Sequence, residues 1–191
     1  DLIGTATASG DNYIYGSNGY DLLVSAGGKD LVVAGAGDDL ILSDFGGNLY
    51  ADSTADTYTW SYTIQKEGDS YTPVITGITV YSGEIPGDDD VVYAGTGNDF
   101  VNAGGGDDEV YGGVGNDTIF GHAGNDFIEG GAGDDILSGD NGDLLAPELN
   151  GSDYIDGGAG NDRIYGDGGN DELFGGDGLD TISGNEDDDY L

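Results

Sequence analysis

The sequence predicts an all-β repeat fold in which short strands stack along one axis, and three observations support this prediction. Residues 94–138 repeat every nine residues, as AGTGNDFVN, AGGGDDEVY, GGVGNDTIF, GHAGNDFIE and GGAGDDILS. In each nonapeptide, position 4 is Gly, position 6 is Asp, and position 8 is Val, Ile or Leu. An unbroken period with three chemically different fixed positions is typical of a repeat architecture.

The repeat predicts its own local structure. Glycine at up to three of nine positions excludes a continuous helix, whereas a three-residue strand followed by a six-residue glycine turn satisfies every fixed position. The middle residue of each strand then points inward. Two nonapeptides make one rung with strands on opposite sides, and successive rungs lie about 4.8 Å apart. The inward residues include Ile14, Leu23, Val32, Ile41, Val101, Val110, Ile119, Ile128 and Leu137.

Composition limits the partners. The chain of 191 residues has 39 Asp and Glu against 3 Lys and Arg, for a net charge of -36. Such a polyanion repels nucleic acid and anionic membrane surfaces, so cations are the partners it can hold. No apolar run reaches transmembrane length, and we expect no membrane insertion. Because the acids are periodic, we favour an ordered chain over a disordered tail; a chain that stays disordered until cations arrive also fits.

The period divides the chain into three parts. Residues 1–42 carry looser N-terminal repeats, residues 43–84 lose the frame, and residues 85–191 form the main repeat array. The offset of 42 residues is not a multiple of nine, so 43–84 is an insertion. Its alternating Thr57–Ile64 run, a turn at residues 66–70 and a second β-rich run predict a β-hairpin.

The N-terminal repeats carry apolar residues on both sides of the inward position, namely Leu22, Val24, Leu31, Val33, Leu40 and Leu42. These side chains point outward, and an exposed apolar surface of that extent indicates that something covers it. We favour the hairpin as a structural cover. The alternative is a hairpin that binds a ligand or partner.

The frame is also disturbed at residues 139–156, where two interpretations fit. If residues 143–151 are a loop inserted in a turn, Asp126 and Asp153 share one edge of the stack. If 139–147 is a degenerate repeat, Asp135 and Asp153 share an edge instead. We favour the loop, because Pro147 fits poorly in a strand.

The turns have the composition of calcium sites. Glycine leaves backbone carbonyls bare, position 6 adds a carboxylate beside them, and turns of adjacent rungs place these oxygens together. Hard oxygen ligands in a flexible cage suit Ca²⁺ better than Mg²⁺, Zn²⁺ or copper. His122 occupies a turn position where Gly is usual, and we expect it to be an ordinary surface histidine.

Over residues 7–42 and 85–191 the chain resembles the RTX (repeats-in-toxin) family of secreted bacterial proteins. The resemblance implies a right-handed parallel β-roll, a β-helix solenoid of nine-residue repeats, here with an inserted β-hairpin-like segment. It also implies multiple Ca²⁺ ions, held by turn carbonyls and position-6 carboxylates; Asn12 departs from this pattern. The position-6 acids are Asp21, Asp30, Asp39, Asp90, Asp99, Asp108, Asp117, Asp126, Asp135, Asp153, Asp162, Asp171, Asp180 and Asp189.

We therefore expect a non-catalytic Ca²⁺-binding module of a larger protein that is exported by a type I system and folds outside the bacterium. Its partners would be calcium, other domains of the same protein, or further copies of itself. The alternative is a structural segment of a surface layer, adhesin or extracellular fibre. No HExxH, GxSxG, P-loop or GxGxxG motif indicates an enzyme.

Overall fold

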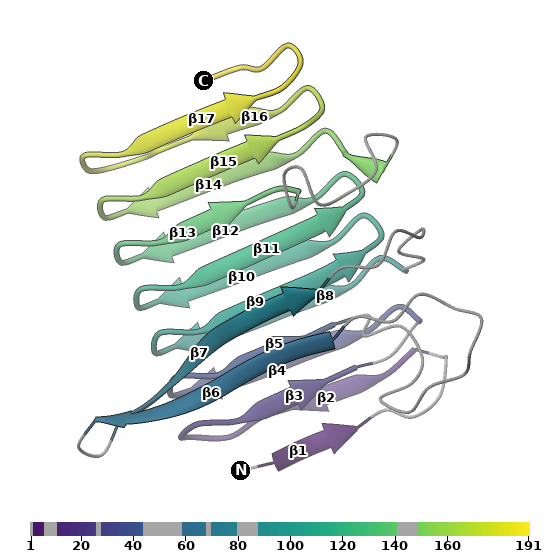
Figure 1. The fold of residues 1–191 in the computed structure, drawn as a ribbon, viewed down its shortest axis with the longest axis vertical. Helices are drawn as coiled ribbons and strands as arrows, with labels where there is room; N and C mark the ends of the chain where they lie inside the picture. The colour runs from purple at the N-terminus through teal and green to yellow at the C-terminus, as the bar shows by residue number, and fades with distance from the viewer. Residues whose placement is uncertain are drawn as a thin grey trace.

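The fold is a flattened solenoid built from two parallel sheets that face each other (Figure 1). The computed structural model describes residues 2–5, 11–25, 28–43, 59–67, 70–79, 88–140 and 149–191. The chain alternates between the two sheets, so each pair of consecutive strands forms one rung, as expected from the sequence. The parallel β-roll implied by the repeat is therefore confirmed.

One sheet has eight strands and the other seven, all in parallel pairs. The eight-stranded sheet contains, in spatial order, β1 (Leu2–Thr5), β3 (Leu22–Val24), β5 (Leu40–Leu42), β9 (Phe100–Gly105), β11 (Thr118–Ala123), β13 (Ile136–Ser138), β15 (Arg163–Asp167) and β17 (Thr181–Asn185). The seven-stranded sheet contains β2 (Tyr13–Tyr15), β4 (Leu31–Ala36), β8 (Val91–Thr96), β10 (Glu109–Val114), β12 (Phe127–Ala132), β14 (Tyr154–Ala159) and β16 (Glu172–Phe174).

The hydrophobic core is a double column of position-8 side chains between the sheets. Each side chain stacks on its counterpart in the next rung, as Val110 does on Ile128. Small residues at position 1, such as Ala34 and Ala94, complete the core. The buried position-8 residues are Ile14, Leu23, Val32, Ile41, Val92, Val101, Val110, Ile119, Ile128, Leu137, Ile155, Ile164 and Leu173.

The register between rungs shows where extra residues enter. Neighbouring position-6 residues are 18 apart in most rungs, but Asp30 and Asp90 are 60 apart. Asp126 and Asp153 are 27 apart, and Asp135 and Asp162 share the same offset. This is the pairing expected of a nine-residue loop in the turn. Gly151 lies in register with Gly124, so the additional residues precede Gly151.

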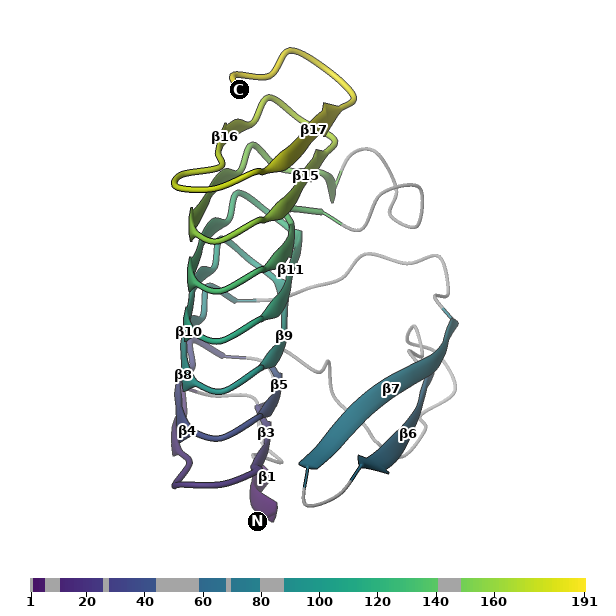
Figure 2. The same ribbon diagram turned by 90° about the vertical axis from the view of Figure 1, so that its left-hand side faces the viewer.

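The insertion at 43–84 contains a two-stranded antiparallel hairpin, β6 (Thr59–Glu67) and β7 (Ser70–Thr79). A bulge lies where Ser61 pairs with Gly77 and Tyr62 with Ile75, which agrees with a glycine inside a strand. Figure 2 shows the hairpin on the side of the eight-stranded sheet, at the level of its N-terminal strands. In the described ranges, no helix is long and apolar enough to cross a membrane.

The outward apolar residues of the N-terminal repeats lie on two opposite faces. Leu22, Val24, Leu40 and Leu42 belong to β3 and β5, whereas Leu31 and Val33 belong to β4 in the other sheet. Leu40 is buried and the other five are half-buried. A single hairpin beside the eight-stranded sheet does not reach both faces, and whether it covers one of them stays a prediction.

A column of aromatic rings runs along the outer face of the seven-stranded sheet. The rings of Tyr93 and Tyr111 stack with centroids 4.8 Å apart, and those of Phe127 and Tyr154 with centroids 5.1 Å apart. Tilted contacts join these pairs to each other and extend the column through Phe174 to Tyr190. The rings can stack because successive rungs lie about 4.8 Å apart, which is close to the spacing of stacked aromatic rings.

Candidate metal centre

The position-6 residues form two rows, one along each edge of the roll. The row that precedes the seven-stranded sheet contains Asn12, Asp30, Asp90, Asp108, Asp126, Asp153, Asp171 and Asp189. The row that precedes the eight-stranded sheet contains Asp21, Asp39, Asp99, Asp117, Asp135, Asp162 and Asp180. All the sequence-predicted acids therefore lie in these two rows.

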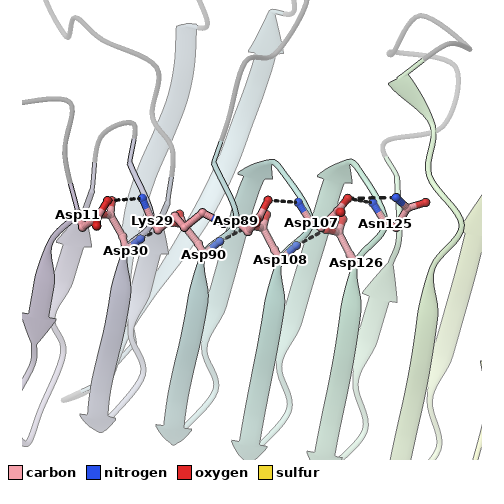
Figure 3. Close-up of polar contacts among 9 residues, drawn as sticks. All are labelled: Asp11, Lys29, Asp30, Asp89, Asp90, Asp107, Asp108, Asn125 and Asp126. Carbon is pink, nitrogen blue, oxygen red and sulfur yellow. Dashed lines mark hydrogen bonds and ion pairs between the residues drawn. The ribbon is translucent and has the colours of Figure 1, made fainter.

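Within each row, one carboxylate oxygen is used by the chain. The backbone N–H of each position-6 residue donates to Oδ1 of the position-6 Asp in the next rung. Asp90 donates to Asp108 at 2.7 Å, and Asp117 donates to Asp135 at 2.8 Å. Figure 3 shows part of the first row, with Asp30, Asp90, Asp108 and Asp126 in line. Because the N–H follows a glycine turn and has no strand partner, the carboxylate satisfies it.

The other oxygen, Oδ2, is buried and lacks a hydrogen-bond partner at many of these residues. This holds for Asp30, Asp39, Asp99, Asp117, Asp126, Asp135, Asp153, Asp162 and Asp171. A buried carboxylate oxygen with no donor is strongly unfavourable. A row of such atoms therefore indicates a missing positive partner.

Backbone carbonyls lie beside these oxygens. At position 1 of a turn, a Cβ on Gly112 would be 2.6 Å from Oδ2 of Asp117 and 2.6 Å from the Gly130 carbonyl of the next rung. Gly130 repeats this arrangement with Asp135 and the Gly157 carbonyl, at 2.6 and 2.8 Å. The glycine is required because any side chain would fill the space that the two oxygens share.

Burial, with a smaller effect of neighbouring carboxylates, raises the pKa of several of these acids. Burial raises the pKa of Asp99 and of Asp135 to about 7, against hydrogen bonds that lower it, and neighbouring carboxylates raise it further. Burial also raises the pKa of Asp153 to about 8. A nearby cation would reverse this, because it favours the charged form of each acid.

The basic residue Lys29 does not supply that cation. It occupies position 5, in a separate exposed row with Asp11, Asp89, Asp107 and Asn125 (Figure 3). Lys29 pairs there with Asp89, and both side chains are largely exposed. The hydrogen bond and charge of Lys29 lower the pKa of Asp89, so the pair affects only the outer row.

The donor set fits a hard cation. Within the described ranges, no three acidic or histidine side chains converge on one point. A bound ion would therefore combine a carboxylate oxygen with several turn carbonyls. Flexible oxygen cages of this kind suit Ca²⁺, whereas Zn²⁺ and copper favour nitrogen and sulfur ligands.

The chain matches the family of the RTX calcium-binding nonapeptide repeat, in units of four copies, over residues 7–41, 87–119, 111–143, 149–182 and 168–191. These segments cover most of the chain. The chain belongs to the RTX calcium-binding repeat family. No curated protein matches it significantly over its sequence. RTX repeats are structural calcium-binding modules.

The two rows of position-6 residues depart from this pattern toward their ends. Asp21 has its Oδ2 bound by the Ser17 N–H at 2.7 Å; burial opposes ionisation, but this bond together with further hydrogen bonds and a positive charge lowers its pKa. Asn12 donates its N–H and its amide to Asp30 and brings no carboxylate. At the other end, Asp180 and Asp189 are only half-buried.

Two residues of the RTX turns were not assigned correctly from the sequence. His122 is 5% exposed and its ring nitrogens have no partner, so the expectation of a surface histidine is wrong. Its ring lies 6.0 Å from that of Phe120, in a partly stacked arrangement. Asp140 is fully buried although it is not a position-6 acid. The only signal in the sequence was a polar side chain at position 2, where many turns have Gly.

Proposed function

We propose that this chain is a Ca²⁺-binding β-roll module of a larger secreted bacterial protein, exported by a type I system and folded by extracellular calcium. The observation that carries the proposal is the row of buried Oδ2 atoms without partners along each edge. The chain has only 3 Lys and Arg against 39 Asp and Glu, too few basic residues to neutralise these rows.

The physical argument is one of coupled binding and folding. Stacking the rungs brings carboxylates of successive turns together in a buried setting, which costs free energy unless a cation enters. Binding energy at such sites is therefore folding energy. A chain of this kind stays unfolded where calcium is scarce and folds where it is plentiful. RTX proteins are in general secreted by type I systems, which supports the extracellular setting.

The test is far-ultraviolet circular dichroism of the full chain during a calcium titration from excess chelator. We expect little β-structure in chelator and cooperative folding at millimolar Ca²⁺. Mg²⁺ at the same concentration serves as the control and should not substitute, because it prefers a rigid octahedral site. A complete β-signal in excess chelator would refute calcium-dependent folding.

The second candidate is a structural segment of a surface layer, adhesin or fibre. Its support is the apolar surface that the roll exposes: Leu179 is 85% exposed at one turn, and Tyr13 is 73% exposed on the outer face of β2. Sedimentation velocity against calcium concentration separates the candidates. A particle that grows as calcium rises favours assembly, whereas a monomer at every concentration favours the module.

A further inference from the structure

The two edges of the roll differ at position 2 of their turns. In turns that lead into the eight-stranded sheet, this position is Ser17 in the first turn and Gly with positive φ in the later ones, at Gly35, Gly95, Gly113, Gly131, Gly158 and Gly176. On the other edge, consecutive turns carry His122, Asp140, Asp167 and Asn185 instead. His122, Asp167 and Asn185 have φ of 84°, 75° and 74°. Side chains in this backbone conformation are strained, and such strain is concentrated at functional sites.

Asp140 is the most buried member of this set. Its Oδ1 accepts the N–H of Gly151 and its Oδ2 accepts the N–H of Gly168, both at 3.3 Å, so both bonds are long. Ser138 Oγ donates to the Asp140 carbonyl at 2.5 Å and lies 2.6 Å from Oδ2 of Asp167. Among the described residues, no Lys or Arg side chain forms an ion pair with Asp140.

Two buried oxygens without partners lie in the same turn. Asp153 is 2% exposed, and its Oδ2 lies against Gly139, the residue before Asp140. The carbonyl of Gly166 is 2.9 Å from the Cβ position of that glycine. Asn150 Oδ1 is also buried without a partner, and the amide nitrogen of the same side chain lies against Gly168, whose N–H binds Asp140. Burial raises the pKa of Asp153 to about 8, and the negative charge of Asp140 raises it further.

The geometry points to an additional cation site in this turn, in which the carboxylate of Asp140 and the amide oxygen of Asn150 join Oδ2 of Asp153, an oxygen that this ion would share with the ion of the row. An ordinary turn of the repeat supplies one carboxylate and backbone carbonyls, because its position 2 is Gly. Here the turn supplies a second carboxylate and a neutral side-chain oxygen. Two carboxylates balance the charge of one divalent cation, and an all-oxygen set selects Ca²⁺.

The proposed site depends on the calcium-dependent folding proposed above. It is tested at saturating calcium, where the roll is already folded. Native mass spectrometry of the full chain counts bound ions at saturating calcium. We expect Asp140→Asn to bind one Ca²⁺ fewer than the wild type while keeping the same circular dichroism. Asp134→Asn is the matched control, because Asp134 lies at exposed position 5 of the opposite edge and should leave the count unchanged. An unchanged count for Asp140→Asn means that Asp140 only ties the turn to Gly151 and Gly168, and overturns the proposal.

Variants at Asn150 give an independent test that leaves Asp140 intact. If Asn150 ligates the ion, Asn150→Asp strengthens the site and lowers the calcium concentration for half-occupancy of that ion by about tenfold, and Asn150→Ala loses the ion. If there is no such site, Asn150→Asp only adds negative charge to an acidic chain and raises the calcium needed for folding. That second result overturns the proposal even if Asp140→Asn fails to fold. Loss of calcium-dependent folding in the wild type would instead refute the proposed function.

Discussion

Most buried position-6 aspartates use one oxygen for the backbone, and we propose that the other oxygen binds a cation. Oδ1 of Asp117 accepts the N–H of Asp99 at 2.8 Å, whereas its Oδ2 has no protein partner. The two tasks require different chemistry, because an amide oxygen can accept the N–H but an amide nitrogen cannot ligate Ca²⁺. Substitution by asparagine at this position therefore keeps the hydrogen bond to the backbone and removes the metal ligand.

Asp117→Asn should keep the hydrogen bond and weaken one calcium site in the middle of a row. We expect the calcium midpoint of folding to rise severalfold, since a charged ligand is lost from one of several coupled sites. The measurement is circular dichroism against free calcium. Asp107→Asn is the control, because Asp107 is exposed at position 5 and its Oδ1 accepts the backbone N–H and the side-chain amide of Asn125. Equal midpoints for the two variants would contradict the assignment of Oδ2 to the metal.

At the scale of the element, the turn is defined by the close approach of one rung to the next. Gly115 has φ of 139°, and a Cβ there would overlap the carbonyl of Gly97 in the preceding rung. Gly19 also has positive φ, at 106°, but nothing lies within 4 Å of its Cβ position. Substituting Gly19 therefore tests the cost of the backbone conformation alone, whereas substituting Gly115 tests that cost together with crowding.

Gly19→Ala should cost only the left-handed backbone penalty, roughly 1–2 kcal/mol. Gly115→Ala adds an overlap with backbone that has no room to move, so its loss of stability in calcium should be clearly larger. Thermal unfolding at saturating calcium measures both. A similar decrease in Tm for the two variants would show that the rungs can separate to admit a methyl group.

The insertion between β5 and β8 leaves the ladder of strands unbroken. β4 pairs directly with β8 and β5 with β9, with Val32 opposite Val92 and Ile41 opposite Val101. Removing residues 43–84 joins Leu42 to Ile85 in the nine-residue frame. We expect this deletion to fold in calcium with a midpoint within about threefold of the wild type, because no rung is lost.

The same deletion tests the expected role of the hairpin. If the hairpin covers the outward leucines of β3 and β5, the shortened chain should fold but associate, which light scattering detects. A deletion that stays monomeric removes the covering role and favours a binding role. A deletion that does not fold in any calcium concentration would show that the hairpin belongs to the core of the protein.

The period of nine was sufficient to predict the roll, the inward column and the two acidic rows, because position in the repeat determines position in the rung. It was not sufficient for β1, since Leu2 and Ile3 precede the first recognisable repeat. It also missed the burial of His122 and Asp140. Those side chains occupy a position that is Gly in many other turns, so their surroundings depend on neighbouring rungs rather than on their own repeat.

The whole molecule behaves as a polyanion whose acids are held close together. In the folded roll without metal, the pKa values of Asp99 and Asp135 are raised to about 7 and that of Asp153 to about 8, from ordinary values near 3.8. The folded state therefore binds protons more tightly than the unfolded state. Their contribution to stability is complete below about pH 4 and is lost as the pH rises through 7 to 8.

We expect the metal-free chain to gain β-structure when the pH is lowered from about 8 to about 5, because protons replace the missing cations. The calcium-bound protein should respond in the opposite sense, with weaker calcium binding at the lower pH, since protons and calcium compete for the same oxygens. Circular dichroism and calcium titrations at the two pH values measure these effects. A metal-free signal that does not change with pH would contradict the raised pKa values.

The aromatic column on the seven-stranded sheet gives the roll a spectroscopic signal of its own. Tyr93 and Tyr111 belong to different rungs, and their nearly parallel rings meet only when those rungs stack. Excitonic coupling between such rings adds near-ultraviolet dichroism that a separated chain lacks. The single tryptophan, Trp60, lies in β6 of the hairpin and emits at longer wavelength. The folding of the roll and of its insertion can thus be followed separately in one unlabelled sample.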